Sequence, residues 1–401
     1  MAEPLLKNDD KILKKIAETA MTGKGAEAAK EVLSDIIIKA VRIVSEGNKI
    51  DLEDIKIEKK VGGGIEDSEL IQGIVLDKER VHSGMPKIIN NAKIALLDVA
   101  LEVKSTEIDA KIQISEPSQL QSFIDQEEKI LRDMSDRIIK SGANVVFCQK
   151  GVDDLAQYFL AKAGVYVARR VKKSDMEKLS RSTGARILSK VSELNPEELG
   201  QAGVVEEIKT GEDEMTYVRD CKNPRSVTIF LKGGTQHVVA EVERAVKDAL
   251  GDVSAALRDG KVVAGAGSTE IEVARKLREY ANTLSGREQL AVLAFADAME
   301  IVPRTLAENA GLDPIDMLTE LKAKHDAKMK WAGIDVFNGK VVDAWEMGVI
   351  EPLKIKTQAV KSASEVAELI LRIDDVIAGS ASRGPQMPQG MGGMGGMPGM
   401  E

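Results

Sequence analysis

Aromatic residues are scarce in this chain, and so are other residue types that often mark a function. Phe, Trp and Tyr together make up only 3% of the 401 residues, so a surface that stacks nucleic-acid bases is not expected. The two cysteines, Cys148 and Cys221, are too few for a disulfide framework or a zinc cluster. The three histidines, at positions 82, 237 and 325, are scattered along the chain, and no metal site is predicted.

Long runs of a single residue class are missing as well. The chain has no extended Lys/Arg run and its net charge is −9, so it lacks the positive footprint of a nucleic-acid-binding protein. No apolar run is long enough to span a bilayer, and no signal peptide is recognisable. These absences predict a cytoplasmic protein that binds neither nucleic acid nor a membrane.

What the chain does contain is enough apolar sequence for more than one core. Hydrophobic residues make up 43% and charged residues 30% of the sequence, which is typical of a soluble globular protein. A length of 401 residues predicts two or three domains.

The order of the predicted elements divides the chain into helical, α/β and helical parts. Residues 9–46 have helical spacing, and strand-like segments follow near Ile55 and over 70–76. Strands at 143–149, 165–171 and 186–188 alternate with two helices, the second with a capping box at Ser174 and Glu177. This alternation predicts a parallel α/β layer inserted into a helical body. The remaining predicted elements are a strand at 226–231, helices at 235–259, 268–284, 287–301, 304–310, 313–326 and 360–377, and a β segment at 336–344.

The segment 114–137 is predicted to be a helix that is only partly packed on its own domain. Apolar residues lie on both sides of the charged run 125–129, and they include Phe123, Ile124, Ile130 and Leu131. Its acidic centre argues against a membrane-surface helix. Two interpretations remain open: the apolar residues belong to the core, or they form a face that binds a partner.

Three short features suggest phosphate chemistry, and each has a simpler explanation. Gly265-Ala266-Gly267 opens a helix, where backbone N–H groups can approach an anion, but a plain helix-entry turn has the same sequence. The loop Thr22-Gly23-Lys24-Gly25 lacks the residues that a P-loop needs. Asp248 lies on a polar stripe of the helix 235–259 with Glu241, Arg244 and Asp252, and an ordinary solvated face explains this pattern.

Taken together, several longer segments resemble the archaeal group II chaperonin subunit, the thermosome, which is related to the eukaryotic cytosolic chaperonin. The similar segments occur in family order along nearly the whole chain: TAMTGKGAEAAKEVL (19–33), ELIQGIVLDKERVHSGMP (69–86), ANVVFCQKGVDDLAQYFLAKAGVYVARRVKKSDMEKL (143–179), VVAGAGSTEIEVARKLREYA (262–281), LAENAGLDPIDML (306–318), GIDVFNGKVVDAWEMGVIEPLKIKTQAV (333–360) and the tail GMGGMGGMPGM (390–400).

The resemblance implies an α/β multidomain fold with a helical equatorial half, an intermediate hinge domain and an inserted α/β apical domain with a helical protrusion. The implied boundaries are 1–72 and 222–260 for the intermediate domain and 73–221 for the apical polypeptide-binding domain, whose lid protrusion lies near 114–137. Residues 261–380 would form the C-terminal half of the equatorial ATPase domain, and 381–401 a disordered Gly/Met tail.

The resemblance also implies roles for single residues. Asp248 matches the family aspartate that positions the attacking water, and Lys24, with Gly23 beside it, matches the lysine that senses the γ-phosphate. Gly265, Ala266 and Gly267 match the glycine turn at the nucleotide, with Ala266 where the family often has Gly. Asp335 and Glu351 fall where the family contacts the base and ribose. Phe123, Ile124, Ile130 and Leu131 are the predicted polypeptide-binding residues.

One part of the family pattern is missing from the sequence. The Leu-Gly-Pro phosphate loop and the Gly-Asp-Gly-Thr-Thr motif, which supplies the magnesium-binding Asp, do not occur in the 401 residues. A chain that lacks the N-terminal equatorial half would have this sequence. Without those groups the charge stabilisation of phosphoryl transfer is incomplete.

Two functions follow as alternatives. The first is an ATP-dependent chaperone subunit, with ATP and Mg²⁺ as cofactors, that folds unfolded polypeptides in a homo- or hetero-oligomeric double ring. The second is an ATP-independent protein that holds unfolded chains through its apical domain. A metabolic nucleotide enzyme is disfavoured, because no small-substrate constellation is found.

Overall fold

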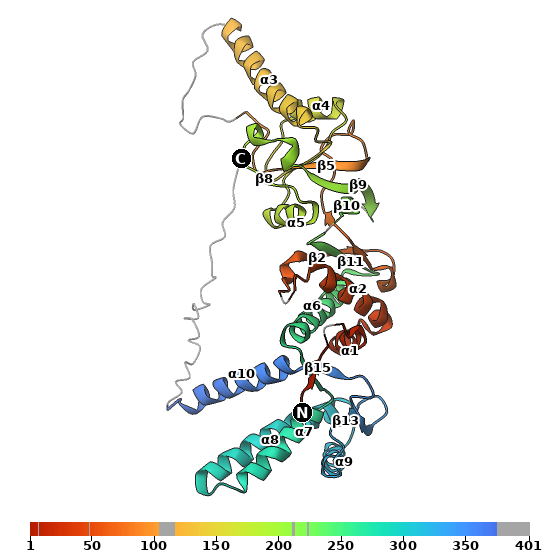
Figure 1. Cartoon of the computed structure of the whole chain (residues 1–401), viewed down its shortest axis with the longest axis vertical. Coiled ribbons are helices and arrows are strands. Elements are labelled where there is room, and N and C mark those ends of the chain that lie inside the picture. The colour runs from red at the N-terminus through yellow and green to blue at the C-terminus, as the bar shows by residue number, and fades with distance from the viewer. Residues whose placement is uncertain (7, 48, 104–116, 211–212, 223, 375–401) are drawn as a thin grey trace, which may run out of the picture. The chain divides into compact units, whose positions relative to one another are not determined.

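The computed structural model describes residues 1–6, 8–47, 49–103, 117–210, 213–222 and 224–374 (Figure 1). The predicted Gly/Met tail and the first residues of the predicted protrusion lie outside these ranges. By its internal contacts the chain divides into two units, Met1–Lys356 and Thr357–Glu401. The described part of the second unit consists mainly of residues 357–371 of helix α10 (Leu353–Leu371). The predicted three-domain division remains a prediction.

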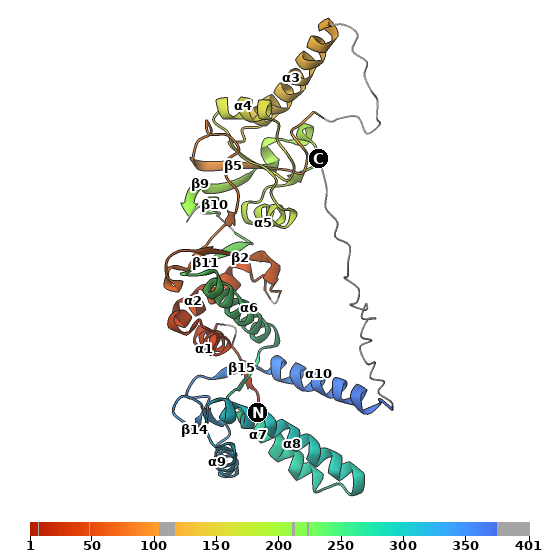
Figure 2. The same ribbon diagram turned by 180° about the vertical axis from the view of Figure 1, so that it is seen from behind.

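In the first unit, segments from the start and the middle of the chain share one core. Helices α1 (Asp10–Met21), α2 (Lys30–Val44) and α6 (Gln236–Asp259) pack around one another, as the two views in Figures 1 and 2 show. They lie against a sheet in which β11 (Val227–Gly233) pairs in parallel with β2 (Ile55–Val61) and antiparallel with β3 (Glu69–Ile71). The apolar faces of these elements, which have helical spacing in the helices, meet in this core.

A mixed sheet of seven strands is the central element of residues 74–221. Its order is β4-β10-β9-β5-β6-β7, and β8 also pairs with β5. The strands are β4 (Ile74–Leu76), β5 (Ile88–Leu97), β6 (Val145–Cys148), β7 (Tyr166–Ala168), β8 (Ile187–Leu188), β9 (Gly200–Thr210) and β10 (Asp213–Arg219). The predicted parallel layer is correct for β6, β7 and β8, which form parallel pairs, but β6 and β8 both pair with β5, a strand that was not predicted. The prediction missed the antiparallel part formed by β4, β9 and β10.

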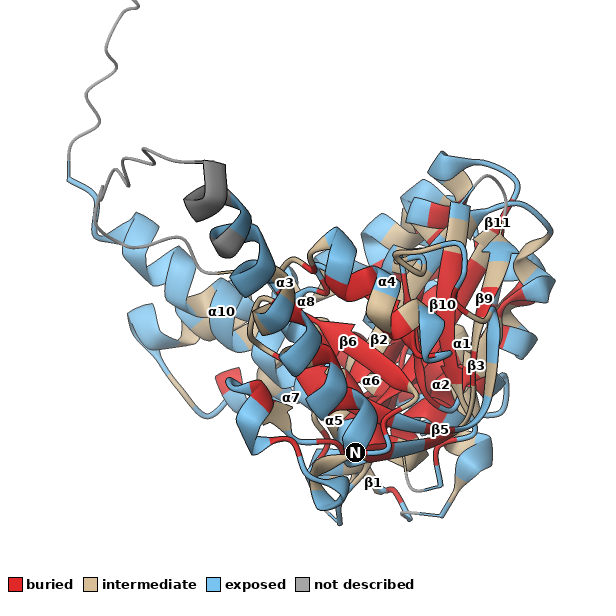
Figure 3. Ribbon diagram, turned by 90° about the horizontal axis from the view of Figure 1, so that it is seen from above, coloured by how far each residue is buried: buried red, intermediate tan, exposed pale blue. Residues whose placement is uncertain are grey.

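Helices cover both faces of this sheet. Alternate residues of β5 and β6 belong to two different cores, as the period of a strand requires. Helix α5 (Lys173–Thr183) packs on one face through Met176 and Leu179. Helices α3 (Pro117–Lys140) and α4 (Asp154–Lys162) contribute to the core on the other face. The buried strands appear between exposed helices in Figure 3.

Between α6 and α10 the chain contains three helices and most of the strands of two small sheets. Strand β12 (Lys261–Ala264) pairs with β1 (Glu3–Pro4) and β15 (Ile350–Pro352), and β13 (Ala332–Asp335) forms a hairpin with β14 (Lys340–Asp343). The helices are α7 (Ser268–Ala281), α8 (Gly286–Asn309) and α9 (Pro314–Asp326). Five short 3-10 turns complete the described elements: η1 (Glu27–Ala29), η2 (Leu52–Asp54), η3 (Ile65–Asp67), η4 (Val191–Glu193) and η5 (Pro196–Glu198).

Three predicted local features are wrong. The predicted helices 287–301 and 304–310 are a single helix, α8, that continues through Pro303. The predicted capping box of Ser174 and Glu177 does not form, because α5 begins at Lys173 and has no side-chain cap. The predicted strand 70–76 is two strands, separated at Gly73. This glycine has φ 153°, and a Cβ at its position would lie 2.0 Å from the carbonyl oxygen of Val218.

Candidate functional site

Lys24 stands at the tip of a turn that its neighbouring glycines make possible. Gly23 and Gly25 have φ values of 78° and 66°, a left-handed conformation that glycine adopts without steric cost. The turn follows α1, and it brings the Lys24 ammonium to within 2.5 Å of the Asp248 Oδ2 atom on α6. Residues that are 224 positions apart in the sequence therefore form an ion pair. Both side chains are partly exposed and remain accessible to a ligand.

Asp252 lies one helical turn beyond Asp248, on the same face of α6. Burial, together with the negative charges of Glu351 and Asp248, raises the pKa of Asp252 to about 6, and the charge of Lys24 acts in the opposite direction. This electrostatic coupling indicates that Lys24, Asp248, Asp252 and Glu351 face a common region. Sequence reasoning had assigned Asp252 to a solvated stripe and missed it. Its spacing of four residues from Asp248 was the available signal.

The glycine turn 265–267 joins β12 to the N-terminus of α7. Ala266 and Gly267 are both left-handed, with φ 55° and 76°, and Gly267 is the N-cap of α7. A Cβ at Gly265 would lie 2.6 Å from the Glu351 Oε1 atom, and a Cβ at Gly267 would lie 2.6 Å from Pro303 Cβ. A side chain at Gly267 would therefore collide with Pro303, and one at Gly265 would displace the Glu351 carboxylate. The open backbone of this turn precedes a helix N-terminus, which favours anions.

Two buried polar atoms near this turn have no hydrogen-bond partner: Ser268 Oγ and Glu270 Oε2. Buried polar groups are normally paired, so an orphaned one needs an explanation such as a missing ligand. The Ser268 hydroxyl can donate to an anion, so together with the glycine turn and the Lys24–Asp248 pair it fits a site for a phosphorylated ligand. The Glu270 carboxylate is itself a negatively charged acceptor and does not add to such a site.

Asp335 is held by its own turn. Its carboxylate accepts hydrogen bonds from the backbone N–H groups of Phe337 and Asn338 and from the Asn338 side-chain amide. These hydrogen bonds, with that of the Asn338 side chain first, lower the pKa of Asp335. The hairpin is tied to the glycine turn, because the Ile334 N–H donates to the Ala266 carbonyl oxygen over 3.0 Å. A nucleotide contact by Asp335 remains a prediction.

Metal ligands do not cluster in the described part of the chain. No group of three or more His, Cys, Asp or Glu side chains among those residues is arranged to hold a metal ion. The same residues include no helix long and apolar enough to cross a membrane.

The predicted polypeptide-binding residues divide by exposure. Phe123 and Ile124 on α3 are 40% and 47% exposed, whereas Leu131 is only 2% exposed and belongs to the core that α3 shares with the sheet. Ile130 is half-buried. Leu131 therefore cannot contact a client without opening the domain, and its assignment as a polypeptide-binding residue is corrected to a core residue. The neighbouring helix α4 adds two exposed apolar side chains that sequence reasoning missed, Leu155 and Tyr158.

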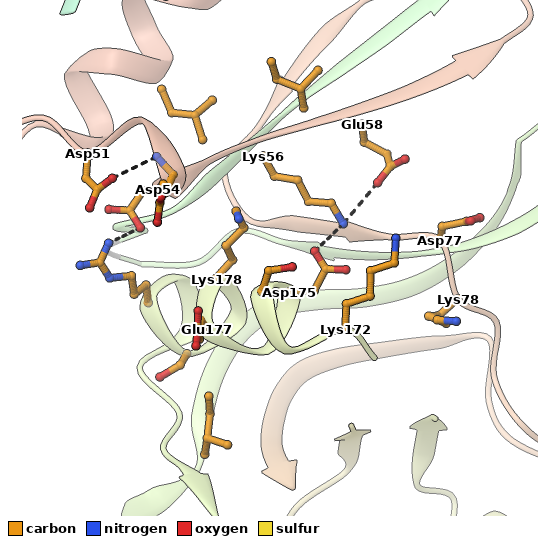
Figure 4. Close-up of a pocket in the computed structure, with 17 residues that line it drawn as sticks. Asp51, Asp54, Lys56, Glu58, Asp77, Lys78, Lys172, Asp175, Glu177 and Lys178 are labelled. Atoms are coloured by element: carbon orange, nitrogen blue, oxygen red, sulfur yellow. Dashed lines mark hydrogen bonds and ion pairs between the residues drawn. The ribbon is translucent and has the colours of Figure 1, made fainter. Parts of the chain in front are cut away.

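A cavity of about 1020 Å³ lies elsewhere, between α5 and the strand β2 (Figure 4). In the close-up, the Lys56 ammonium lies between two carboxylates, 2.9 Å from Asp175 and 3.2 Å from Glu58. Arg181 on α5 also pairs with Asp54 of η2. The walls carry charges of both signs and no aromatic residue, and they show no catalytic constellation. We interpret this cavity as the space between α5 on one side and β2 and η2 on the other, which these ion pairs hold together.

Comparisons with known proteins agree with the resemblance in the sequence. The model of the TCP-1/cpn60 chaperonin family matches residues 2–380. The chain is 60% identical over 403 residues to a thermosome subunit beta of Archaeoglobus fulgidus, covering 97% of this chain and 74% of that protein. It is 59% identical to a thermosome subunit of Methanopyrus kandleri, covering 94% of this chain and 70% of that protein.

A solved structure is similar as well. An open-state monomer of a group II chaperonin from Methanococcoides burtonii superimposes with a TM-score of 0.66 at 49% sequence identity. The match covers 93% of this chain and 88% of the other.

Proposed function

The chain belongs to the TCP-1/cpn60 chaperonin family, and we propose on this basis that it is a subunit of an ATP-dependent molecular chaperone. In this proposal it binds and folds unfolded polypeptides in the cytoplasm, within a double ring of chaperonin subunits. Archaeoglobus fulgidus has similar subunits named alpha and beta, so the proposed ring is either homomeric or heteromeric. The three-domain division predicted from the sequence is part of the proposal.

The observation that carries the proposal is the Lys24–Asp248 ion pair. The pair places an ammonium suited to a γ-phosphate against a carboxylate suited to orienting a water molecule. The glycine turn before α7 would hold other phosphate oxygens, and Glu351 and Asp335 would contact the sugar and the base. When bound, Mg²⁺ would neutralise phosphate charge, but the family motif that supplies its ligands does not occur in the 401 residues. We therefore expect this chain alone to bind ATP without turning it over.

A second candidate function is ATP-independent holding of unfolded polypeptides. It is favoured by the exposed Phe123 and Ile124 on α3 and by Leu155 and Tyr158 on the adjacent α4. Apolar side chains next to charged ones suit weak contacts with many different partners. This activity needs no nucleotide and is compatible with the first function.

The test of the nucleotide site is the substitution Lys24→Met. Without the ammonium, the affinity of the 401-residue chain for ATP should fall by about tenfold, whereas its affinity for ADP should change less, because ADP has no γ-phosphate. Isothermal titration calorimetry measures both affinities.

Lys14→Met is a matched control for this change. Lys14 is 34% exposed, nearly the same as Lys24 at 35%, and it pairs with Asp35 over 2.8 Å. It should leave both affinities unchanged. Equal losses for ATP and ADP, or no binding of ATP by the unmodified chain, would contradict the proposed site. Phosphate release that disappears in Asp248→Ala would contradict the expectation of no turnover.

A further inference from the structure

Lys356, in the first turn of α10, carries a partly buried ammonium that two carboxylates share. Its Nζ atom lies 2.6 Å from Glu351 Oε2 and 2.7 Å from Glu270 Oε1. Burial acts to lower the pKa of Lys356, but the charges of Glu351 and Glu270 and their hydrogen bonds outweigh burial and raise it. Lys356 is therefore a fixed positive charge between β15 and α7. The sequence analysis gave it no role.

The two oxygens of Glu351 have different surroundings. Oε2 is held by Lys356, whereas Oε1 faces the glycine turn, where a Cβ at Gly265 would lie 2.6 Å from it. Strand pairing sets the backbone of Glu351, because it lies opposite Val263 in the β12–β15 ladder. The side chain is then oriented by one strong contact, to Lys356. Its second oxygen remains available as an acceptor beside the turn.

Negative charge is concentrated around Glu351. Asp252 interacts electrostatically with Glu351, and Glu270 shares the Lys356 ammonium with it. The second oxygen of Glu270 has no partner. Carboxylates that share a partly buried site repel one another and tend to take up a proton or to turn away. Lys356 is the cation that offsets this negative charge and holds the Glu351 side chain in place.

From this geometry we propose that Lys356 is a positioning residue for the nucleotide. It holds the Glu351 carboxylate so that Oε1 accepts a hydrogen bond from a ribose hydroxyl of ATP. Glu270 anchors Lys356 from the opposite side. The inference rests on the proposed nucleotide site. It adds to that site a chain of two ion pairs, from Glu270 on α7 through Lys356 to Glu351 on β15. A purely structural role, in which the ion pairs only fasten α10, is the alternative that the test must exclude.

The test measures discrimination between nucleotides rather than affinity alone. Dissociation constants of the 401-residue chain are determined for ATP, 2′-deoxy-ATP and 3′-deoxy-ATP. The unmodified chain should prefer ATP over at least one deoxy analogue by about tenfold, because a carboxylate that loses its donor is left unpaired. In Lys356→Met this ratio should fall to about one. If Lys356 only stabilises the fold, Lys356→Met should lower the stability of the chain and leave the ratio of the ATP and deoxy-ATP dissociation constants unchanged.

Two further variants keep the test decisive. Lys322→Met removes a lysine that pairs with Glu300 over 2.7 Å on other helices, and it should preserve the ratio. If Lys356→Met does not fold, the double variant Lys356→Met/Glu270→Leu also removes Glu270, the more deeply buried of the two carboxylates that lose their cation. Replacing a buried ion pair by apolar residues is usually tolerated. This variant should also lose the ratio.

The outcomes separate the inference from the proposed function. A preserved ratio in the folded lysine variants overturns the inference and leaves the nucleotide site intact. Binding of ATP without any preference for its ribose hydroxyls overturns the inference as well. No binding of ATP by the unmodified chain overturns both.

Discussion

At the scale of a single residue, Asp252 should make the stability of the folded chain depend on pH. Burial, more than any other cause, raises its pKa from the ordinary 3.8 of an aspartate to about 6. A carboxyl with a raised pKa holds its proton more tightly in the folded chain, so it favours folding most when it is protonated. The stabilisation that comes from the protonated Asp252 is lost as the pH rises from the ordinary pKa of 3.8 through the raised pKa of about 6. Above it, the charged carboxylate opposes folding.

We predict that Asp252→Asn stabilises the chain at neutral pH. The gain should be about 1–2 kcal/mol near pH 7.5, allowing for partial exposure, and it should disappear as the pH falls to about 4. Thermal unfolding of both proteins across this pH range measures the difference. A gain that is constant with pH, or a loss at neutral pH, would show that Asp252 is not held in this environment.

The roles of single residues were only partly predictable from the sequence. Spacing alone placed Asp248 on a polar stripe, and only the family resemblance singled it out. The structure then brings Lys24 to it across 224 positions of sequence. Lys356 and Glu270 could not have been found this way, because their importance depends on a three-way contact between α7, β15 and α10.

At the scale of elements, the ion pairs of Lys56 connect β2 to α5, and their removal should destabilise α5 locally. Lys56 contacts Asp175 and Glu58, and it donates to the Val75 carbonyl oxygen over 2.7 Å. Its side chain is only 12% exposed, so removing it leaves partly buried carboxylates without a cation. We expect Lys56→Met to speed amide hydrogen exchange in α5 by about tenfold, while α7 and β12 exchange as before.

Lys59→Met provides a control for that measurement. Lys59 lies on the same strand and pairs with Glu243 on α6, so its loss should not affect α5. If amide hydrogen exchange in α5 is unchanged in Lys56→Met, or increases equally in both variants, the Lys56 ion pairs do not stabilise α5.

Elements with strong local signals were predicted well, and those that depend on distant contacts were not. The periodic helix α6 was correct to within a residue or so, because its cap and apolar stripe are local signals. Helix α8 was wrongly divided at Pro303, a residue that normally breaks a helix. This proline is buried, and a Cβ at Gly267 would lie 2.6 Å from its Cβ. Such a contact between distant segments is not visible in the local sequence.

The antiparallel strands β9 and β10 were missed for a related reason. Their residues mix charged and apolar side chains, and several carboxylates on them are paired with basic partners only in the folded sheet. Glu206 pairs with Arg219 across the two strands, and Glu207 with Arg80. Such pairings depend on register, which the sequence of one strand does not reveal.

At the scale of the whole molecule, the account requires that this chain bind unfolded polypeptides. The most direct test follows the aggregation of a chemically denatured client by light scattering, with and without the 401-residue chain. The double variant Phe123→Ser/Ile124→Ser removes the exposed apolar side chains of α3. Ile315→Ser, at a residue of α9 that is 69% exposed, is the matched control, and circular dichroism confirms that each variant is folded.

The account predicts that the unmodified chain and the Ile315→Ser variant slow aggregation equally, without added ATP. The double variant, still folded, should lose about half or more of this protection, because apolar contact area is the main source of such binding. Aggregation that proceeds at the same rate with and without the unmodified chain would contradict the chaperone function, and full protection by the folded double variant would show that α3 is not the surface that binds clients.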